Sequence, residues 1–159
     1  MNIILNVNQA TLLSEKMRSE GKVVVLVGGC FDVLHIGHID FLTKAKSRGD
    51  LLFVLLESDE AIKKLKGPQR PFHTQKERAA VLASLRAVDI VITLPNVLSN
   101  VEYDKVVKLL QPAIIATTEG DPTIIHKERQ AKSLGAQLVL VNTRLKHVST
   151  SRAVDVLQE

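Results

Sequence analysis

One stretch decides how the chain folds: Val23-Val24-Val25-Leu26-Val27-Gly28-Gly29-Cys30-Phe31-Asp32-Val33-Leu34-His35-Ile36-Gly37-His38. Its apolar start predicts a buried strand, and its two glycines predict the turn where that strand ends. Because glycine has no side chain, Gly28 and Gly29 let the backbone approach a bulky anion closely. The helical pattern that follows offers free N–H groups and the positive end of a helix dipole at the same point. The stretch therefore predicts a nucleoside triphosphate site.

Two histidines stand three residues apart at the start of this predicted helix. His35 and His38 would share one face and both reach a bound anion, while Gly37 between them keeps the surface open. A metal site needs about three protein ligands, and Cys30 has no His-rich or Cys-rich cluster beside it. A simple turn would explain the glycines alone, but not their combination with the histidines. We expect phosphate binding here and no metal site.

The same residues carry a family resemblance. Their pattern resembles the Gly-x-Phe-Asp-x-x-His-x-Gly-His signature of cytidylyltransferase-like nucleotidyltransferases, matched here by Gly29, Phe31, Asp32, His35, Gly37 and His38. The resemblance implies a Rossmann-like domain that moves a nucleoside monophosphate from a triphosphate to an acceptor and releases pyrophosphate. It implies a nucleotide-binding role for Gly28, Gly29, Cys30, Phe31, Asp32 and Gly37. We expect Asp32 to brace the glycine turn or a histidine rather than bind a metal.

Length and composition predict one domain over residues 1–159. Hydrophobic residues make up 45% of the chain and charged residues 24%, as in globular proteins. No apolar run reaches the 18 or so residues that span a bilayer, and the first residues lack the features of a signal peptide. Cys30 is the only cysteine, so no internal disulfide can form. These features predict a cytoplasmic protein without a membrane partner.

The net charge of +4 has two explanations, nucleic acid and a small phosphorylated ligand. Lysines and arginines are spread from Lys16 to Arg152, aromatic residues are 3% of the chain, and there is no tryptophan to form a stacking surface. A phosphate-rich small molecule explains this spread, so we expect no nucleic-acid partner.

Strand and helix patterns alternate along the chain. We expect helices over 8–20, from His38 to Gly49, and over 59–66, 74–86, 101–110 and 121–135, with Asn8, Thr74 and Ser149 as caps. Five strands are predicted, over 22–27, 51–56, 89–94, 113–116 and 137–141. This order predicts an α/β fold, a Rossmann-like open parallel sheet of about five strands with helices on both faces. Ligands of such sheets bind at the carboxyl ends of the strands.

The chemistry needs donors and cations more than a nucleophile. An acceptor phosphate is already ionised near neutral pH, so the protein must hold two anions in line and stabilise developing charge. His35 and His38 would donate hydrogen bonds, and Lys46 would add a charge from the same helix. Lys46 also matches the Ala-Lys-x-x-Gly-Asp that closes this helix in cytidylyltransferases, which implies phosphate contact. We predict these three residues as the catalytic set.

Other candidates come from the loops and the tail. Arg144 with Ser149 and Thr150 resembles the Arg-Thr-Glu-Gly-Ile-Ser-Thr element of cytidylyltransferases, which implies contact with the triphosphate. Candidate substrate contacts are Arg70, Arg78, Asp59 and Asp121. Mg²⁺ would arrive with the triphosphate and stay partly hydrated, so it needs no dedicated ligands.

Between the two signatures, the chain resembles the adenylyltransferase half of bifunctional ADP-heptose synthesis proteins. The match includes Leu65-Lys66-Gly67-Pro68-Gln69-Arg70-Pro71 and Glu77-Arg78. The chain departs at Thr118-Glu119-Gly120-Asp121, where that branch has Lys-Gly-Gly-Asp. The resemblance implies AMP transfer from ATP to a phosphorylated small molecule such as a sugar 1-phosphate.

Two alternatives stay open. A CTP-dependent cytidylyltransferase for a polyol or alcohol phosphate is favoured by Arg144 and Ser149-Thr150. A nucleotide-binding module without turnover is the second, although binding alone would not require both His35 and His38. Dimers are common in the families that the chain resembles, so a homodimer is an expectation too.

Overall fold

The central strands are buried on both faces, as their unbroken apolar runs predict. The structure, a computed structural model, describes residues 3–143. Its sheet is parallel throughout and has the order β1-β4-β3-β2-β5-β6. The strands are β1 (Ile3–Asn6), β2 (Val24–Gly29), β3 (Leu51–Leu56), β4 (Ile90–Thr93), β5 (Ile114–Glu119) and β6 (Gln137–Thr143).

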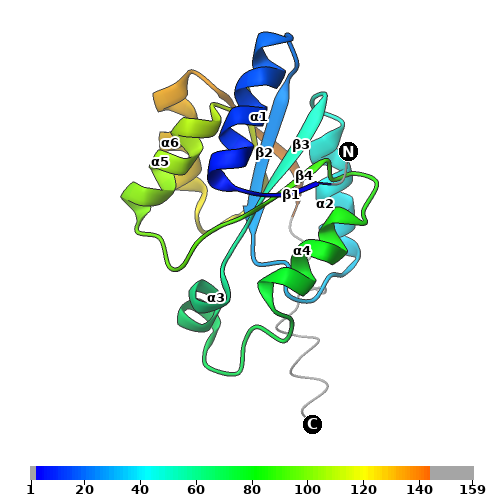
Figure 1. Cartoon of the computed structure of the whole chain (residues 1–159), viewed down its shortest axis with the longest axis vertical. Coiled ribbons are helices and arrows are strands. Elements are labelled where there is room, and N and C mark those ends of the chain that lie inside the picture. The colour runs from blue at the N-terminus through cyan, green and yellow to red at the C-terminus, as the bar shows by residue number, and fades with distance from the viewer. Residues whose placement is uncertain (1–2, 144–159) are drawn as a thin grey trace.

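Helices cover both faces of this sheet (Figure 1). One face packs against α1 (Val7–Ser19), α5 (Asn100–Leu110) and α6 (Ile124–Leu134), and the other against α2 (Ile36–Lys46) and α4 (Gln75–Ala83). A short helix, α3 (Asp59–Lys66), lies beyond the carboxyl ends of the strands. Within residues 3–143 no helix is long and apolar enough to cross a membrane.

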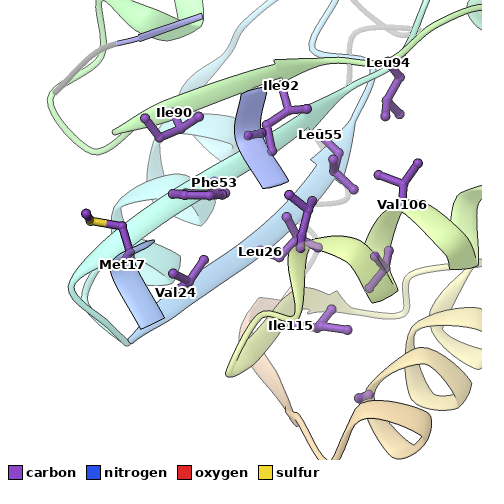
Figure 2. Close-up of a cluster of buried hydrophobic side chains, with 14 residues drawn as sticks. Met17, Val24, Leu26, Phe53, Leu55, Ile90, Ile92, Leu94, Val106 and Ile115 are labelled. Carbon is purple, nitrogen blue, oxygen red and sulfur yellow. The ribbon is translucent and has the colours of Figure 1, made fainter. Parts of the chain in front are cut away.

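Successive side chains of each central strand point to opposite faces of the sheet and join two different hydrophobic clusters. Val24 and Leu26 join the cluster under α1 and α5, whereas Val25 and Val27 join the cluster under α2 and α4. Figure 2 shows the first cluster, in which side chains from α1 and α5 meet those of the central strands. Full burial of each such side chain stabilises the fold by about 1.5–3 kcal/mol. The strands that carry the site are therefore the most firmly held part of the sheet.

The alternation of strands and helices is confirmed, and the sheet gains one strand at its edge. β1 was not predicted because its four residues are partly exposed and too few to show a period. The first helix consequently begins earlier than expected. Its cap is Asn6, which exchanges side-chain and backbone hydrogen bonds with Gln9, and not Asn8.

Two helix ends also differ from the prediction. The capping box of Thr74 and Glu77 is confirmed, but α4 ends at Ala83 rather than near residue 86. Helix α6 begins at Ile124 rather than at residue 121, because Asp121 to Thr123 form a turn. The side chain of Asp121 accepts from the backbone N–H of Thr123, which fixes this turn.

The strand order reverses beside β2. Its neighbours are β3 on one side and β5 on the other, and the connections from these strands lead to helices on opposite faces. In open α/β sheets a crevice forms at such a switch point, outside the carboxyl ends of the strands. Gly28 and Gly29 end β2 at this point.

Candidate active site

The two histidines close the first turn of α2 by capping each other. His35 is the N-cap residue, and its Nδ1 accepts from the backbone N–H of Gly37 at 3.1 Å. The Nδ1 of His38 accepts in return from the backbone N–H of His35 at 3.4 Å. The two rings stack with their centroids 3.8 Å apart. The predicted shared face is therefore a fixed pair of stacked rings.

The hydrogen bonds assign the protons of both rings. Because each Nδ1 accepts, each neutral ring carries its proton on Nε2 and donates from there. Burial, then His35 and Lys66, lowers the pKa of His38 to about 4. Burial and the charge of Lys66 also lower the pKa of His35. At neutral pH the pair presents two N–H donors, and within residues 3–143 neither Nε2 has a hydrogen-bond partner.

The lysine near this pair is Lys66, not Lys46. Lys66 ends α3, and its charge acts on the pKa values of His35, His38 and Cys30. Lys46 ends α2 at the opposite edge of the sheet, where its Nζ donates to a carboxylate oxygen of Asp89 at 2.7 Å. The expectation that Lys46 joins the histidines is wrong, because an eleven-residue helix carries its two ends about 15 Å apart.

A tight turn packs the glycines against the histidines. Phe31 has a φ of 46°, and its ring lies 5.3 Å from the ring of His38 between centroids. A Cβ on Gly29 would lie 2.9 Å from Cε2 of Phe31. Gly29 is therefore required by the packing of Phe31.

Asp32 braces a distant loop, and not the glycine turn or a histidine ring as the sequence analysis expected. Its carboxylate accepts from Nε of Arg70 at 2.7 Å and from the backbone N–H groups of Phe72 and His73. Arg70 is only 6% exposed, and its guanidinium lies over the ring of Phe72. The Nε of Arg70 is therefore used in an ion pair within the protein, and not in the predicted contact with substrate.

Arg78 has a similar internal role. Its guanidinium donates to the carbonyl oxygens of Cys30, Glu57 and His73 and to the carboxylate of Asp59. It is 2% exposed, so it holds the glycine turn, the end of β3 and the start of α3 together instead of facing a ligand. The substrate-binding role predicted for Arg78 and Asp59 does not fit these contacts.

Asp121 lies at the carboxyl end of β5 in a network of its own. It accepts from Thr117 and forms an ion pair with Lys127. Burial opposes ionisation of Asp121, but the hydrogen bonds from Lys127, Thr117 and Thr123 outweigh it and hold the pKa of Asp121 well below its usual range. Its partner Lys127 faces the neighbouring cavity.

A cavity of about 520 Å³ opens on the other side of the glycine strand end. Backbone of Gly28, Gly29 and Cys30 forms one wall, and residues of α3, α5 and α6 form the others. The volume is in the usual range for small-molecule sites. His35 and His38 are not among the residues that line this cavity, whereas Gly28 and Gly29 at the end of β2 are.

Gly28 is where this wall meets α5, and a methyl group there should be costly. A Cβ on Gly28 would lie 2.6 Å from the hydroxyl oxygen of Tyr103. We expect Gly28→Ala to lower stability by about 1–3 kcal/mol, a typical cost of overpacking. Adding Tyr103→Phe to Gly28→Ala should recover part of the loss, as measured by urea unfolding of both single variants and the pair. Equal stability of Gly28→Ala and the parent would contradict this account.

Sequence analysis did not single out three residues of the candidate site. Lys66 is part of the family match, and its position at the end of α3, just before Gly67-Pro68, is the signal that could have singled it out. Glu57 and Tyr103 both line the cavity. The only sequence signal for Glu57 was its position directly after a predicted strand, and Tyr103 had no such signal. The predicted nucleotide contacts Arg144, Ser149 and Thr150 lie outside the described residues. Within 3–143 no group of three or more His, Cys, Asp or Glu side chains is arranged to hold a metal.

The fold and the paired histidines define a Rossmann-like protein with two imidazole N–H donors at its switch point. The chain belongs to the cytidylyltransferase-like family of nucleotidyltransferases, whose family model matches residues 26–157. A bifunctional protein HldE from Nitratiruptor sp. is 40% identical over 112 residues, which are 70% of this chain and 23% of that protein. One from Aliarcobacter butzleri is 41% identical over 103 residues, 65% of this chain and 21% of that protein. The chain therefore spans less than a quarter of these relatives.

Solved structures agree on the fold. A lipopolysaccharide core biosynthesis protein from Thermoplasma volcanium has a TM-score of 0.63 at 26% identity, covering 78% of this chain and 98% of that one. A pantoate-beta-alanine ligase from Francisella tularensis has a TM-score of 0.64 at 15% identity, covering 99% of this chain and 79% of that one. The second likeness shows the fold alone.

Proposed function

We propose that the chain transfers AMP from ATP to a sugar 1-phosphate and releases pyrophosphate. The observation that carries this proposal is the pair of neutral imidazole donors beside the side-chain-free end of β2. Such donors suit the oxygens of a polyphosphate, and the switch point is where this fold binds nucleotides.

Each part of the site has a task in the transfer. A phosphate oxygen of the acceptor attacks the α-phosphorus, the bond to the β-phosphate oxygen breaks, and pyrophosphate leaves with the electron pair. The Nε2–H groups of His35 and His38 stabilise charge on the reacting phosphate, and Lys66 adds a cation at the same point. No protein base is required because the attacking oxygen is already ionised.

Mg²⁺ fits this scheme as an ion carried by the nucleotide. The groups gathered at the end of β2 are imidazole and backbone N–H donors and a lysine, which bind phosphate oxygens rather than cations. The metal would neutralise charge on the triphosphate, and the protein donors would orient the remaining oxygens.

The choice of a sugar phosphate and ATP rests on likeness. The residues from Leu65 to Pro71 resemble the adenylyltransferase half of ADP-heptose synthesis proteins, and the curated relatives are bifunctional HldE proteins. The similar Thermoplasma volcanium structure is of a lipopolysaccharide core biosynthesis protein, which supports a carbohydrate acceptor. The cavity beside Gly28 has room for one.

The test separates nucleotide binding from transfer. Thermal unfolding with ATP, CTP, GTP or UTP plus Mg²⁺ should show stabilisation by ATP, since a ligand at 100 times its Kd adds about 2.7 kcal/mol. Pyrophosphate release should then follow when ATP is mixed with a heptose 1-phosphate or a hexose 1-phosphate. Stabilisation by CTP alone would favour cytidylyl transfer, and ATP binding without release from any acceptor would contradict the proposed reaction.

A further inference from the structure

Glu57 is fixed at the floor of the cavity by its backbone. It follows the last residue of β3, its N–H donates to the carbonyl of Gly29 at 3.2 Å, and its own carbonyl accepts from Arg78 at 2.9 Å. With both backbone groups held, the side chain lines the cavity. The position of this carboxylate is therefore set by the same bonds that shape the glycine turn.

The carboxylate has an unusual setting for a charged group. Burial raises the pKa of Glu57, opposed by the charge of Arg78. Burial, followed by Glu57 and Cys30, also raises the pKa of Tyr103, whose hydroxyl lines the same wall. Among the described residues neither the carboxylate of Glu57 nor the hydroxyl of Tyr103 has a hydrogen-bond partner. Polar groups in a partly apolar pocket are costly unless something bonds to them.

The rest of the lining indicates what that partner is. Lys64, Lys127 and Arg129 face the cavity, against the carboxylates of Glu57 and Asp104. Two of these cations are already paired, Lys127 with Asp121 and Arg129 with Asp104. With the remaining Lys64 matched by Glu57, the lining carries no net charge that would attract a cationic ligand, whereas neutral hydroxyl groups can donate to the carboxylate of Glu57. Leu65, Val97 and Leu98 add apolar wall suited to the carbon face of a ring.

We propose that Glu57 and Tyr103 select the acceptor by bonding its hydroxyl groups, so that the acceptor is a phosphate ester of a sugar or polyol with hydroxyls away from its phosphate. The proposal rests on the proposed function, and it assigns specificity to two residues of this chain. Glu57 accepts from one or two hydroxyls, and Tyr103 accepts or donates to a neighbouring one. The phosphate of the acceptor then lies toward Gly28 and Gly29, where transfer takes place.

The test compares Glu57→Gln and Tyr103→Phe with the parent and with Glu60→Gln. Glu60 lies on the exposed side of α3, paired with Lys63, and is the matched control. For Glu57→Gln we expect the KM for a heptose or hexose 1-phosphate to rise roughly 10-fold or more, with the KM for ATP unchanged. The reason is that the carboxylate accepts hydrogen bonds with both oxygens, whereas the amide accepts with one atom and donates with the other. The parent should also prefer a sugar 1-phosphate over its deoxy analogue, and Glu57→Gln should lose this preference.

A binding measurement keeps the result independent of turnover. Sugar 1-phosphates should raise the unfolding temperature of the parent in the presence of Mg²⁺ and α,β-methylene-ATP, and should raise that of Glu57→Gln less. No such rise in the parent, or an equal rise in both proteins, would overturn the role of Glu57. A preference for phosphoethanolamine would overturn the hydroxyl assignment. ATP binding and sugar phosphate binding without pyrophosphate release would instead contradict the proposed function and leave the role of Glu57 supported.

Discussion

Replacing His38 by alanine should lower kcat by about 10²–10³, the usual cost of removing one donor to a developing charge. His38 carries its proton on Nε2 because its Nδ1 accepts from the backbone of His35. Its pKa of about 4 keeps the ring neutral at pH 7, so alanine removes a donor and not a positive charge. Single-turnover rates of pyrophosphate release measure the effect on the chemical step directly.

The controls separate catalysis from folding. Alanine also removes a capping contact of α2, which costs about 1 kcal/mol, so urea unfolding must show that the variant is folded at the assay temperature. His73→Ala is the matched substitution, because His73 is exposed and its described hydrogen bonds are made by its backbone. The same kcat for His38→Ala and His73→Ala would contradict the role of His38 as a donor.

Asp32→Asn should lower the free energy of unfolding by about 3–5 kcal/mol, because it leaves the buried charge of Arg70 without its counter-ion. The carboxylate also accepts from the N–H groups of Phe72 and His73, and an amide oxygen cannot serve all three donors. Urea unfolding at pH 7 checks this. Asp40→Asn is the control, since Asp40 pairs with Lys44 at the surface and its loss should change stability far less.

The same carboxylate makes stability depend on pH. Burial favours protonated Asp32, but bonds from Phe72, Arg70 and His73 outweigh it and hold the pKa of Asp32 below its ordinary value of 3.8. The unfolded chain therefore binds a proton more readily, so the stabilisation is complete above that value and is lost as pH falls through the folded-state pKa. Asp32→Asn should lose less stability than the parent between pH 5 and about pH 3. Equal acid sensitivity would contradict this.

Local features of the site were predictable, and long-range ones were not. The capping pair His35 and His38 is encoded within four residues, so spacing alone placed it. The partners Asp32 and Arg70 are 38 residues apart, and Arg78 lies 48 residues from Cys30. Nothing in the local pattern distinguishes an arginine that holds two loops together from one that faces a ligand.

The error at Lys46 has a geometric cause. A helix that connects parallel strands runs back across the sheet, so a residue at its end lies at the edge opposite its start. The resemblance to cytidylyltransferases implied that Lys46 contacts phosphate. The length and direction of α2 instead bring Lys46 beside Asp89. The missed strand β1 has another cause, because four partly exposed residues become a strand only when β4 pairs with them.

The ion pair of Lys46 and Asp89 has a meaning for how such chains diverge. Both partners belong to the same chain, so a substitution at one position can be compensated by a substitution at the other. Asp89 also accepts a hydrogen bond from the backbone N–H of Leu52. On the proposed function, His35 and His38 contact a nucleotide, and no mutation of this chain can change that partner. Across descendants of this chain, we therefore expect Lys46 and Asp89 to change together as a matched pair, and we expect His35 and His38 each to stay unchanged.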